Sequence, residues 1–181
     1  YSTYHVVSFD TITGKVEARQ THQGAADESA WSRGQSWGLY GFTMMYRETG
    51  LERYLSQAKK IAGFLLNHPS LPEDKIPYWD YNAPDIPDAL RDASAGAIMA
   101  SALVELSGYV DPETSKKYLD VAEKQIRTLA SPLSLAKPGT NGNFILMHGV
   151  GSLPGKSEVN VPLTYADYYF IEALLRFRKL L

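Results

Sequence analysis

Two tryptophans and an arginine lie close together in the first quarter of the chain, as Trp31, Arg33 and Trp37. Arg33 and Trp37 have i, i+4 spacing, so on a helix their side chains project from the same face. A guanidinium can bind a carboxylate through two hydrogen bonds, and an indole ring can stack on the apolar face of a sugar ring. The spacing fits a site for an anionic sugar. It also fits, and taken alone favours, a core tryptophan covered by a structural arginine.

Two histidines and a glutamine precede these residues. His5, His22 and Gln23 lie on or just after a predicted β-hairpin, in which extended stretches at 2–9 and 15–22 flank a glycine-containing loop. Imidazole and amide groups donate and accept hydrogen bonds, as hydroxyl and glycosidic oxygens require. The plain alternative is an ordinary strand histidine and a turn glutamine. Two histidines without a well-spaced carboxylate make a poor metal site, so we expect no metal here.

Two pairs of acidic residues are candidates for proton transfer. Asp27 and Glu28 are better explained as acids that stabilise the positive end of a helix starting there. Asp88 and Asp92 have i, i+4 spacing, at which two carboxylates can share a proton, but Asp88 follows Pro87 and is expected to cap a helix. One hypothesis stays open nevertheless, in which the chain is a complete small enzyme that uses one of this second pair.

A glycine-rich segment at 148–157 carries further candidates. It has the glycines of a phosphate-binding loop but not the GxxxxGK[ST] frame, because Val150 stands where the first glycine belongs. We expect a flexible loop that faces a substrate, in which Lys156 and Ser157 offer a cation and a hydroxyl to an anionic ligand. The alternative is a plain surface connection.

Hydrophobic periodicity and end signals predict an all-α fold that begins with a small hairpin over residues 1–24. Acidic and proline starts, glycine ends and apolar residues at i, i+3 and i+4 set the helix limits. The predicted helices span about 27–49, 51–67, 88–107, 111–130 and 163–179. Residues 69–87 hold five of the ten prolines and must form a loop. Residues 131–162 are expected to be irregular apart from a short strand at 144–148.

The helices fall into pairs that resemble each other. The pattern YLxxAxK occurs at 54–60 and again at 118–124, each time after a helix that ends in glycine. The first helix of each pair is rich in Gly and Ala and the second is amphipathic, which is typical of an inner and an outer layer of repeated helical hairpins. Gly34, Gly38 and Gly41 share one face of the first helix and predict a smooth groove for a neighbouring helix.

Composition excludes several classes of protein. The chain has 181 residues, of which 44% are hydrophobic and 21% charged, and this suffices for one domain with a core. Without cysteine it has no disulfide, thiolate metal site or cysteine nucleophile. A formal charge of -2 without any basic run gives no electrostatic footprint for nucleic acid or an anionic membrane. No apolar run is long enough to cross a bilayer, and residues 1–10 lack the pattern of a signal peptide.

Four stretches of the sequence resemble the unsaturated glucuronyl hydrolases, glycoside hydrolase family 88. They are STYHV at 2–6, THQGAADESAWSRGQSWGLYG at 21–41, HG at 148–149 and PLTYADYYFIEAL at 162–174. The resemblance covers essentially the whole chain but only the C-terminal half of the family, whose fold is an (α/α)6 toroid of six helical hairpins. It implies that the chain forms about half of one toroid and that the N-terminal half is its partner.

The resemblance implies a reaction, the removal of a 4,5-unsaturated glucuronic acid from the non-reducing end of oligosaccharides that lyases release. The family hydrates the enol ether double bond, with one aspartate as general acid and base. By the family pattern that aspartate lies upstream of this chain, so neither a catalytic residue nor a metal nor a cofactor is expected within it. A bacterial cytoplasmic and a periplasmic location are not separated by the sequence.

The resemblance also implies a substrate-binding shell. His5, Gln23, Arg33 and Trp37 match substrate-contacting positions of the family, and Trp31 and His22 match adjacent ones. Arg33 is expected to pair with the uronate carboxylate or with nearby polar groups. Ser152, Lys156 and Ser157 lie where the family contacts the next sugar and any sulfate on it.

Two alternatives to this function are weighed against it. The related rhamnogalacturonyl hydrolases share the fold and the chemistry but typically have a different tract in place of RGQSWG, which disfavours them. A hypothesis of another class is a noncatalytic helical module that binds carbohydrate or protein through an aromatic concave face.

Overall fold

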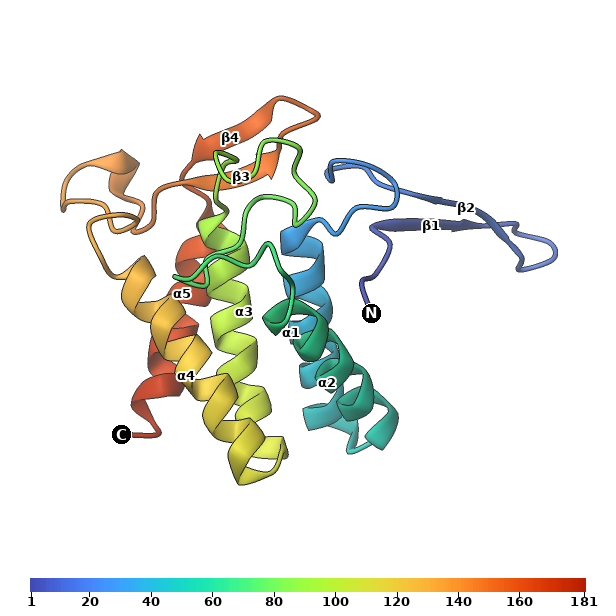
Figure 1. The fold of residues 1–181 in the computed structure, drawn as a ribbon, viewed down its shortest axis with the longest axis horizontal. Coiled ribbons are helices and arrows are strands. Elements are labelled where there is room, and N and C mark those ends of the chain that lie inside the picture. The colour runs from blue at the N-terminus through green and yellow to red at the C-terminus, as the bar shows by residue number, and fades with distance from the viewer.

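The computed structural model describes residues 1–181 and has five α-helices and two small β-hairpins (Figure 1). The helices are α1 (Ser32–Thr49), α2 (Glu52–Leu66), α3 (Ala93–Leu106), α4 (Pro112–Leu129) and α5 (Thr164–Arg178). The strands are β1 (Val6–Phe9), β2 (Val16–Gln20), β3 (Gly149–Ser152) and β4 (Ser157–Val161). Short 3-10 helices occur at Ser107–Tyr109 and Asn141–Asn143.

The helices form two layers. Helices α1, α3 and α5 make one row in which α3 contacts both neighbours, while α2 packs on α1 and α4 packs on α3 and α5. Helix α3 is buried along its whole length except at Glu105, and its Ala, Gly and Ser side chains allow the surrounding helices to approach closely. The predicted pairing of the helices, with a small-residue helix first and an amphipathic helix second, is confirmed.

The repeated YLxxAxK pattern marks the buried stripe of α2 and α4. Leu55 and Ala58 of α2 lie in the same hydrophobic cluster as Tyr118 and Ala122 of α4. The cluster spans both pairs of helices, so the two hairpins share one continuous core. Three of the predicted helices, those of α2, α4 and α5, agree with the structure to within one residue at each end.

Two predicted helix starts are wrong. Helix α1 begins at Ser32, because Asp27 accepts the backbone N–H of Thr21 and Glu28 accepts the hydroxyl of Tyr4. These two acids therefore hold a turn and do not begin a helix. Helix α3 begins after Asp92, whose side chain accepts the backbone N–H of the second helical residue, so Asp92 is the cap and Asp88 is not.

The three glycines of α1 do not form a single groove for a neighbouring helix. A Cβ on Gly34 would lie 2.7 Å from the indole of Trp31, so this position is filled by the helix's own cap residue. Gly38 faces Ile61 of α2 at ordinary contact distance, and nothing lies within 4 Å of a Cβ on Gly41. Gly34 lines a different hollow from Gly38 and Gly41, which lie together in a shallow apolar hollow of α1.

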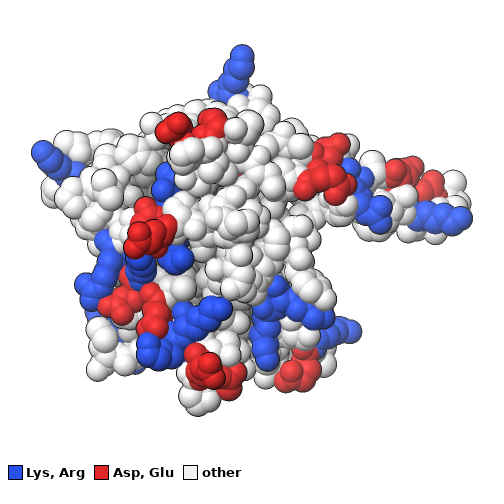
Figure 2. Space-filling model, in the orientation of Figure 1, with Lys and Arg blue, Asp and Glu red and all other residues white.

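The predicted first hairpin is confirmed. Strands β1 and β2 are antiparallel, with Val6 opposite Gln20, and the hairpin projects from the helical body (Figure 1). Lys, Arg, Asp and Glu side chains are interspersed along this hairpin and over the helix ends in Figure 2, with no broad field of one sign on the face shown. None of the helices meets the length and apolarity that crossing a membrane requires.

A second hairpin lies where the sequence predicted an irregular segment. Strands β3 and β4 are antiparallel, with Val150 opposite Val159 and Ser152 opposite Ser157. The expected strand at 144–148 is wrong, since only Leu146 makes an isolated bridge there. The strands were missed because glycines, Glu and Asn interrupt the alternation of polar and apolar residues that marks a strand.

Candidate functional site

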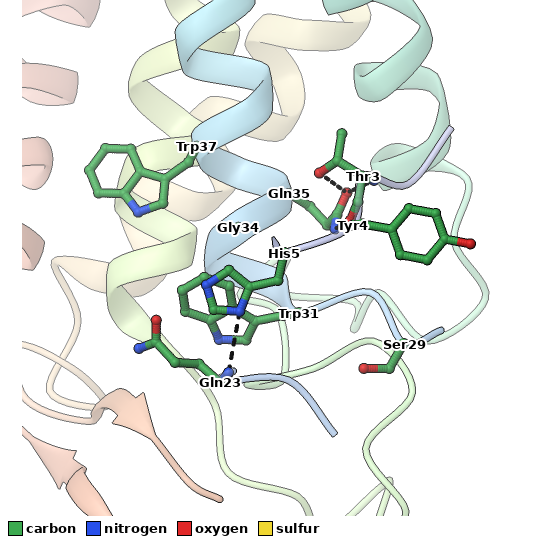
Figure 3. A pocket seen from close by; sticks show the side chains of 9 residues that line it. All are labelled: Thr3, Tyr4, His5, Gln23, Ser29, Trp31, Gly34, Gln35 and Trp37. Atoms are coloured by element: carbon green, nitrogen blue, oxygen red, sulfur yellow. Dashed lines mark hydrogen bonds between the residues drawn. The ribbon is translucent and has the colours of Figure 1, made fainter. Parts of the chain in front are cut away.

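A cavity of about 380 Å³ opens where the N-terminal segment and residues 23–31 meet the start of α1 (Figure 3). This volume is in the range of small-molecule sites in proteins. The residues that line it are Thr3, Tyr4, His5, Gln23, Ser29, Trp31, Gly34, Gln35 and Trp37. The cavity thus brings together four of the six residues predicted for the substrate-binding shell, namely His5, Gln23, Trp31 and Trp37.

Aromatic rings form much of the cavity wall. The imidazole of His5 lies 4.4 Å from the ring of Trp31, centroid to centroid, and the two planes are tilted by 32°. Trp37 is half-buried and is held edge-on by Tyr169 of α5, whose centroid is 5.0 Å away. The wall therefore offers apolar ring surface whose orientation is fixed by neighbouring aromatic side chains.

His5 is held as a neutral hydrogen-bond donor. Its Nδ1 atom accepts the backbone N–H groups of His22 and Gln23, at 3.1 and 3.2 Å. An imidazole nitrogen that accepts carries no proton, so the proton of neutral His5 is on Nε2. Burial lowers the pKa of His5, and the neighbouring charges of His22 and Arg33 lower it further. The free Nε2–H is the group that His5 can offer to a ligand.

Gln23 is anchored through one end of its amide. Its Nε2 donates to the backbone carbonyl of Gly151 on β3, at 2.7 Å, while its Oε1 makes no hydrogen bond within the chain. The oxygen is therefore an acceptor available to a hydroxyl group. The same bond joins the cavity to the β3–β4 hairpin, which sequence reasoning treated as a separate candidate.

Two residues that sequence reasoning did not select build the cavity. Gln35 is buried and fastens the N-terminal segment, because its amide accepts the N–H of Thr3 and donates to the carbonyl of Thr3, each at 2.9 Å. Asp80, from the proline-rich loop, is fully buried and accepts the N–H of Ala25 and the hydroxyl of Ser29. Their partners are distant in sequence, so no local pattern could have identified them.

Arg33 does not line the cavity. Its side chain is 4% exposed, and its guanidinium contacts Asp92 at 3.3 Å and donates to the backbone carbonyls of Val150 and Gly151 at 2.5 and 2.6 Å. Its central carbon lies 4.6 Å from the ring centroid of Trp31, so the cation supports the cavity wall from behind. Both terminal nitrogens of Arg33 donate to groups of the protein, and direct pairing of Arg33 with a uronate stays a prediction.

Asp92 is also fully buried. Its Oδ1 accepts the hydroxyl of Ser94 at 2.6 Å and the backbone N–H of Val150 at 3.3 Å. Burial raises the pKa of the Asp92 carboxyl, and Arg33 and these donors act in the opposite direction. Asp88 lies exposed in the preceding loop. The two acids share no hydrogen bond, and neither lines the cavity.

The remaining predicted residues lie around the cavity. His22 is exposed and contributes its backbone N–H to His5, while its own ring lies 6.3 Å from that of His5. Ser152, Lys156 and Ser157 are on the β3–β4 hairpin and do not line the cavity. The segment that was predicted to be a flexible loop is a hairpin, and its contact with a second sugar stays a prediction.

The cavity lining holds no Asp, Glu, Lys or Arg. The groups that this lining offers to a ligand are therefore aromatic rings and neutral hydrogen-bonding groups. The same composition leaves the lining without a carboxylate that could act as a general acid.

Known proteins place the chain in a family, although no protein-family model matches the sequence. The unsaturated glucuronyl hydrolase of Formosa agariphila is 48% identical over 181 residues, which is 100% of this chain and 44% of that protein. The chain spans about half the length of the curated relatives it matches.

Solved structures agree with this likeness. A crystal structure of an unsaturated glucuronyl hydrolase specific for heparin is 51% identical and superposes with a TM-score of 0.97, over 99% of this chain and 48% of that one. A mutant of the Streptococcus agalactiae unsaturated glucuronyl hydrolase in complex with dGlcA-GalNAc6S is 34% identical with a TM-score of 0.83, again over 99% and 48%. Because sequence and fold agree over its whole length, the chain belongs to the unsaturated glucuronyl hydrolase family and forms about half of one (α/α)6 toroid.

Proposed function

We propose that this chain is the substrate-binding half of a hydrolase that removes unsaturated glucuronic acid from the non-reducing end of lyase-generated oligosaccharides. The observation that carries the proposal is the cavity in which Trp31, Trp37, His5 and Gln23 come together. Relatives that carry the unsaturated glucuronyl hydrolase name match the chain end to end, including one solved with dGlcA-GalNAc6S bound.

Each group has a role that its geometry supports. The half-buried indole ring of Trp37 stacks on the flattened unsaturated ring, the Nε2–H of His5 donates to a sugar oxygen, and the Oε1 of Gln23 accepts a hydroxyl. Trp31 is buried against His5 and Arg33 and supports the His5 ring. Ser152 and Lys156 lie on the hairpin that Gln23 contacts, and we assign them with Ser157 to the second sugar.

The proton needed to hydrate the double bond comes from outside this chain. No carboxylate lines the cavity, and the buried acids Asp80 and Asp92 are occupied by protein donors. Hydration requires a general acid within hydrogen-bonding reach of the alkene carbon and a base for the attacking water. We assign both roles to an aspartate in the rest of the toroid.

Two exposed apolar faces support a partner that completes the toroid. At one end of the row of helices, α1 exposes a shallow apolar hollow formed around Gly41, Met44 and Met45. At the other end, Ile171 and Leu175 on one face of α5 are 43% and 45% exposed. Helix faces of this kind bury their apolar stripe against another helix, so we assign both to contact with the other half.

The activity is tested with the complete gene product and an unsaturated disaccharide, by following the ultraviolet absorbance of the double bond. Absorbance should fall with time, and Trp37→Ala should lower kcat/KM at least about tenfold because it removes a stacking surface. Phe9→Ala, which removes an exposed aromatic ring from the first hairpin, is the matched control and should leave kcat/KM unchanged. Binding of the saccharide without turnover would instead favour a noncatalytic module.

The partner is tested by expressing the two halves as separate chains. They should co-purify, and Ile171→Lys should abolish co-purification because it places a charge in an apolar contact. Ile12→Lys makes the same change at the exposed tip of the first hairpin and should have no effect. Equal recovery with both variants would show that α5 does not face the other half.

A further inference from the structure

We infer that the buried pair Arg33 and Asp92 is a clamp that sets the position of the β3–β4 hairpin against the sugar cavity. The two residues are positioning residues, since neither lines the cavity. The effect of this clamp on a substrate rests on the proposed function, in which the hairpin contacts the second sugar. The clamp itself is a property of the fold and does not depend on that activity.

Both residues of the clamp bind the backbone of the same short stretch of β3. Arg33 donates from one nitrogen to the carbonyl of Val150 and from the other to the carbonyl of Gly151, while Asp92 accepts the N–H of Val150. The pair joins the starts of α1 and α3 to β3, which are far apart in sequence. A planar guanidinium with two parallel donors fixes direction as well as distance, which an ammonium group cannot do.

The hairpin needs such external support. Its strands have four and five residues, and an isolated two-stranded hairpin of this size is at best marginally stable in water. Lys156, Glu158 and Asn160 have φ values of 51°, 54° and 55°, in the left-handed region that costs energy for residues other than glycine. Such a backbone persists only where the surrounding structure imposes it.

The clamp is also connected to the cavity. Arg33 lies against the indole of Trp31. The carbonyl of Gly151 accepts hydrogen bonds from both Arg33 and the cavity residue Gln23. A shift of the hairpin therefore changes the surroundings of Gln23, and loss of the clamp frees the surface that carries Ser152. Ser94 supports the arrangement by donating its hydroxyl to Asp92 at 2.6 Å.

The test uses Asp92→Asn in the complete gene product. The amide keeps the shape of the side chain but removes the charge opposite Arg33. We expect KM for an unsaturated disaccharide to rise at least about tenfold while kcat changes less than about twofold, because the hairpin binds the sugar equally before and during reaction. Hydrogen exchange of the 149–161 amides should accelerate at least about tenfold, while that of α3 stays slow.

Two further variants keep the test decisive if Asp92→Asn does not fold. Ser94→Ala removes one donor to Asp92 and should raise KM by about two- to threefold with the same local acceleration of exchange. Arg33→Lys keeps the charge but loses the fork, and should raise KM more than Ser94→Ala does. Asp88→Asn makes the matched change at an exposed acid and should alter neither quantity.

Three results would overturn the clamp. One is unchanged hairpin exchange in both Ser94→Ala and Arg33→Lys. Another is a fall in kcat at constant KM, because that would place the pair in the chemical step. The third is faster exchange spread evenly over all helices, which would make the pair a general stabiliser. If the gene product shows no turnover, the proposed function fails, while the exchange experiment still decides on the clamp.

Discussion

The two β-hairpins of this molecule are held in opposite ways. The β1–β2 hairpin projects from the body and closes with its own turn, in which Asp10 accepts the backbone N–H and the hydroxyl of Thr13. The β3–β4 hairpin is fixed from outside, through Arg33, Asp92 and Gln23. The first is therefore specified by neighbouring residues and the second by residues that only the folded chain brings near.

The largest expected loss of stability comes from removing the Arg33 side chain, which binds the second hairpin. Arg33→Ala leaves the Asp92 carboxylate buried without its cation, so the free energy of unfolding should fall by about 3–5 kcal/mol. Chemical denaturation measures this loss. Hydrogen exchange should show that β3–β4 opens while β1–β2 keeps its wild-type rates. A loss below about 1 kcal/mol would mean that the ion pair contributes little to the fold.

Substitution of one glycine in each hairpin should lower stability by an intermediate amount, and the loss should differ between the two hairpins. A Cβ on Gly151 would lie 2.5 Å from the Cβ of Glu158 across the hairpin, so Gly151→Ala should cost about 1–3 kcal/mol of stability through overpacking. Gly14, at the turn of the first hairpin, has φ 68° and open space around it, so Gly14→Ala should cost only about 1–2 kcal/mol of backbone strain.

Thermal denaturation of both variants measures the difference. A larger loss in Gly14→Ala than in Gly151→Ala would contradict the view that the second hairpin is constrained by close packing. A local effect on β1–β2 exchange in Gly14→Ala, with none on β3–β4, would support it.

The Asp10 side chain in the turn of the first hairpin should contribute little to global stability. Asp10→Ala removes the acceptor for Thr13 in an exposed position, so exchange of the β1–β2 amides should accelerate while the melting temperature stays close to that of the wild type. Exchange in β3–β4 should not change. Faster exchange in both hairpins would show that they open together, which would contradict the view that separate contacts hold them.

The smallest expected effect is a pH dependence that arises at the cavity between the hairpins. Burial lowers the pKa of His5 below its ordinary value of 6.5, so the unfolded chain takes up the proton first as the pH falls. Stability is therefore lost as the pH drops through about 6.5, and the loss ends below the lowered pKa of the folded state.

The variant His5→Asn isolates the share of His5 in this loss. His68, whose pKa burial also lowers, remains in both proteins and contributes equally. The melting temperature of His5→Asn should decline less steeply between neutral and mildly acidic pH than that of the wild type. Identical slopes would contradict a neutral, accepting His5 in the folded state.

The features that could be predicted from the sequence are those that neighbouring residues specify. Asp111 and Pro112 begin α4 and Gly50 ends α1 because these signals act within one helical turn. The start of α1 could not be read in this way, since Asp27 and Glu28 are used by the hairpin residues Thr21 and Tyr4. The rule for helix starts fails where a contact outside the helix engages the acidic side chain.

The candidate site shows the same limit. His5, Gln23, Trp31 and Trp37 were found through residue type and family resemblance, and the structure brings them to one cavity. The position of Arg33 behind the cavity wall could not be foreseen, because the carbonyls that bind it lie on β3, more than a hundred residues further along the chain.

The most direct measurement is a crystal structure of the complete gene product with an unsaturated disaccharide bound. We expect the unsaturated ring in the cavity against Trp37, with the Nε2–H of His5 donating to a sugar oxygen and Arg33 still bound to Val150. A disaccharide bound elsewhere, with this cavity empty, would contradict the assignment of the site.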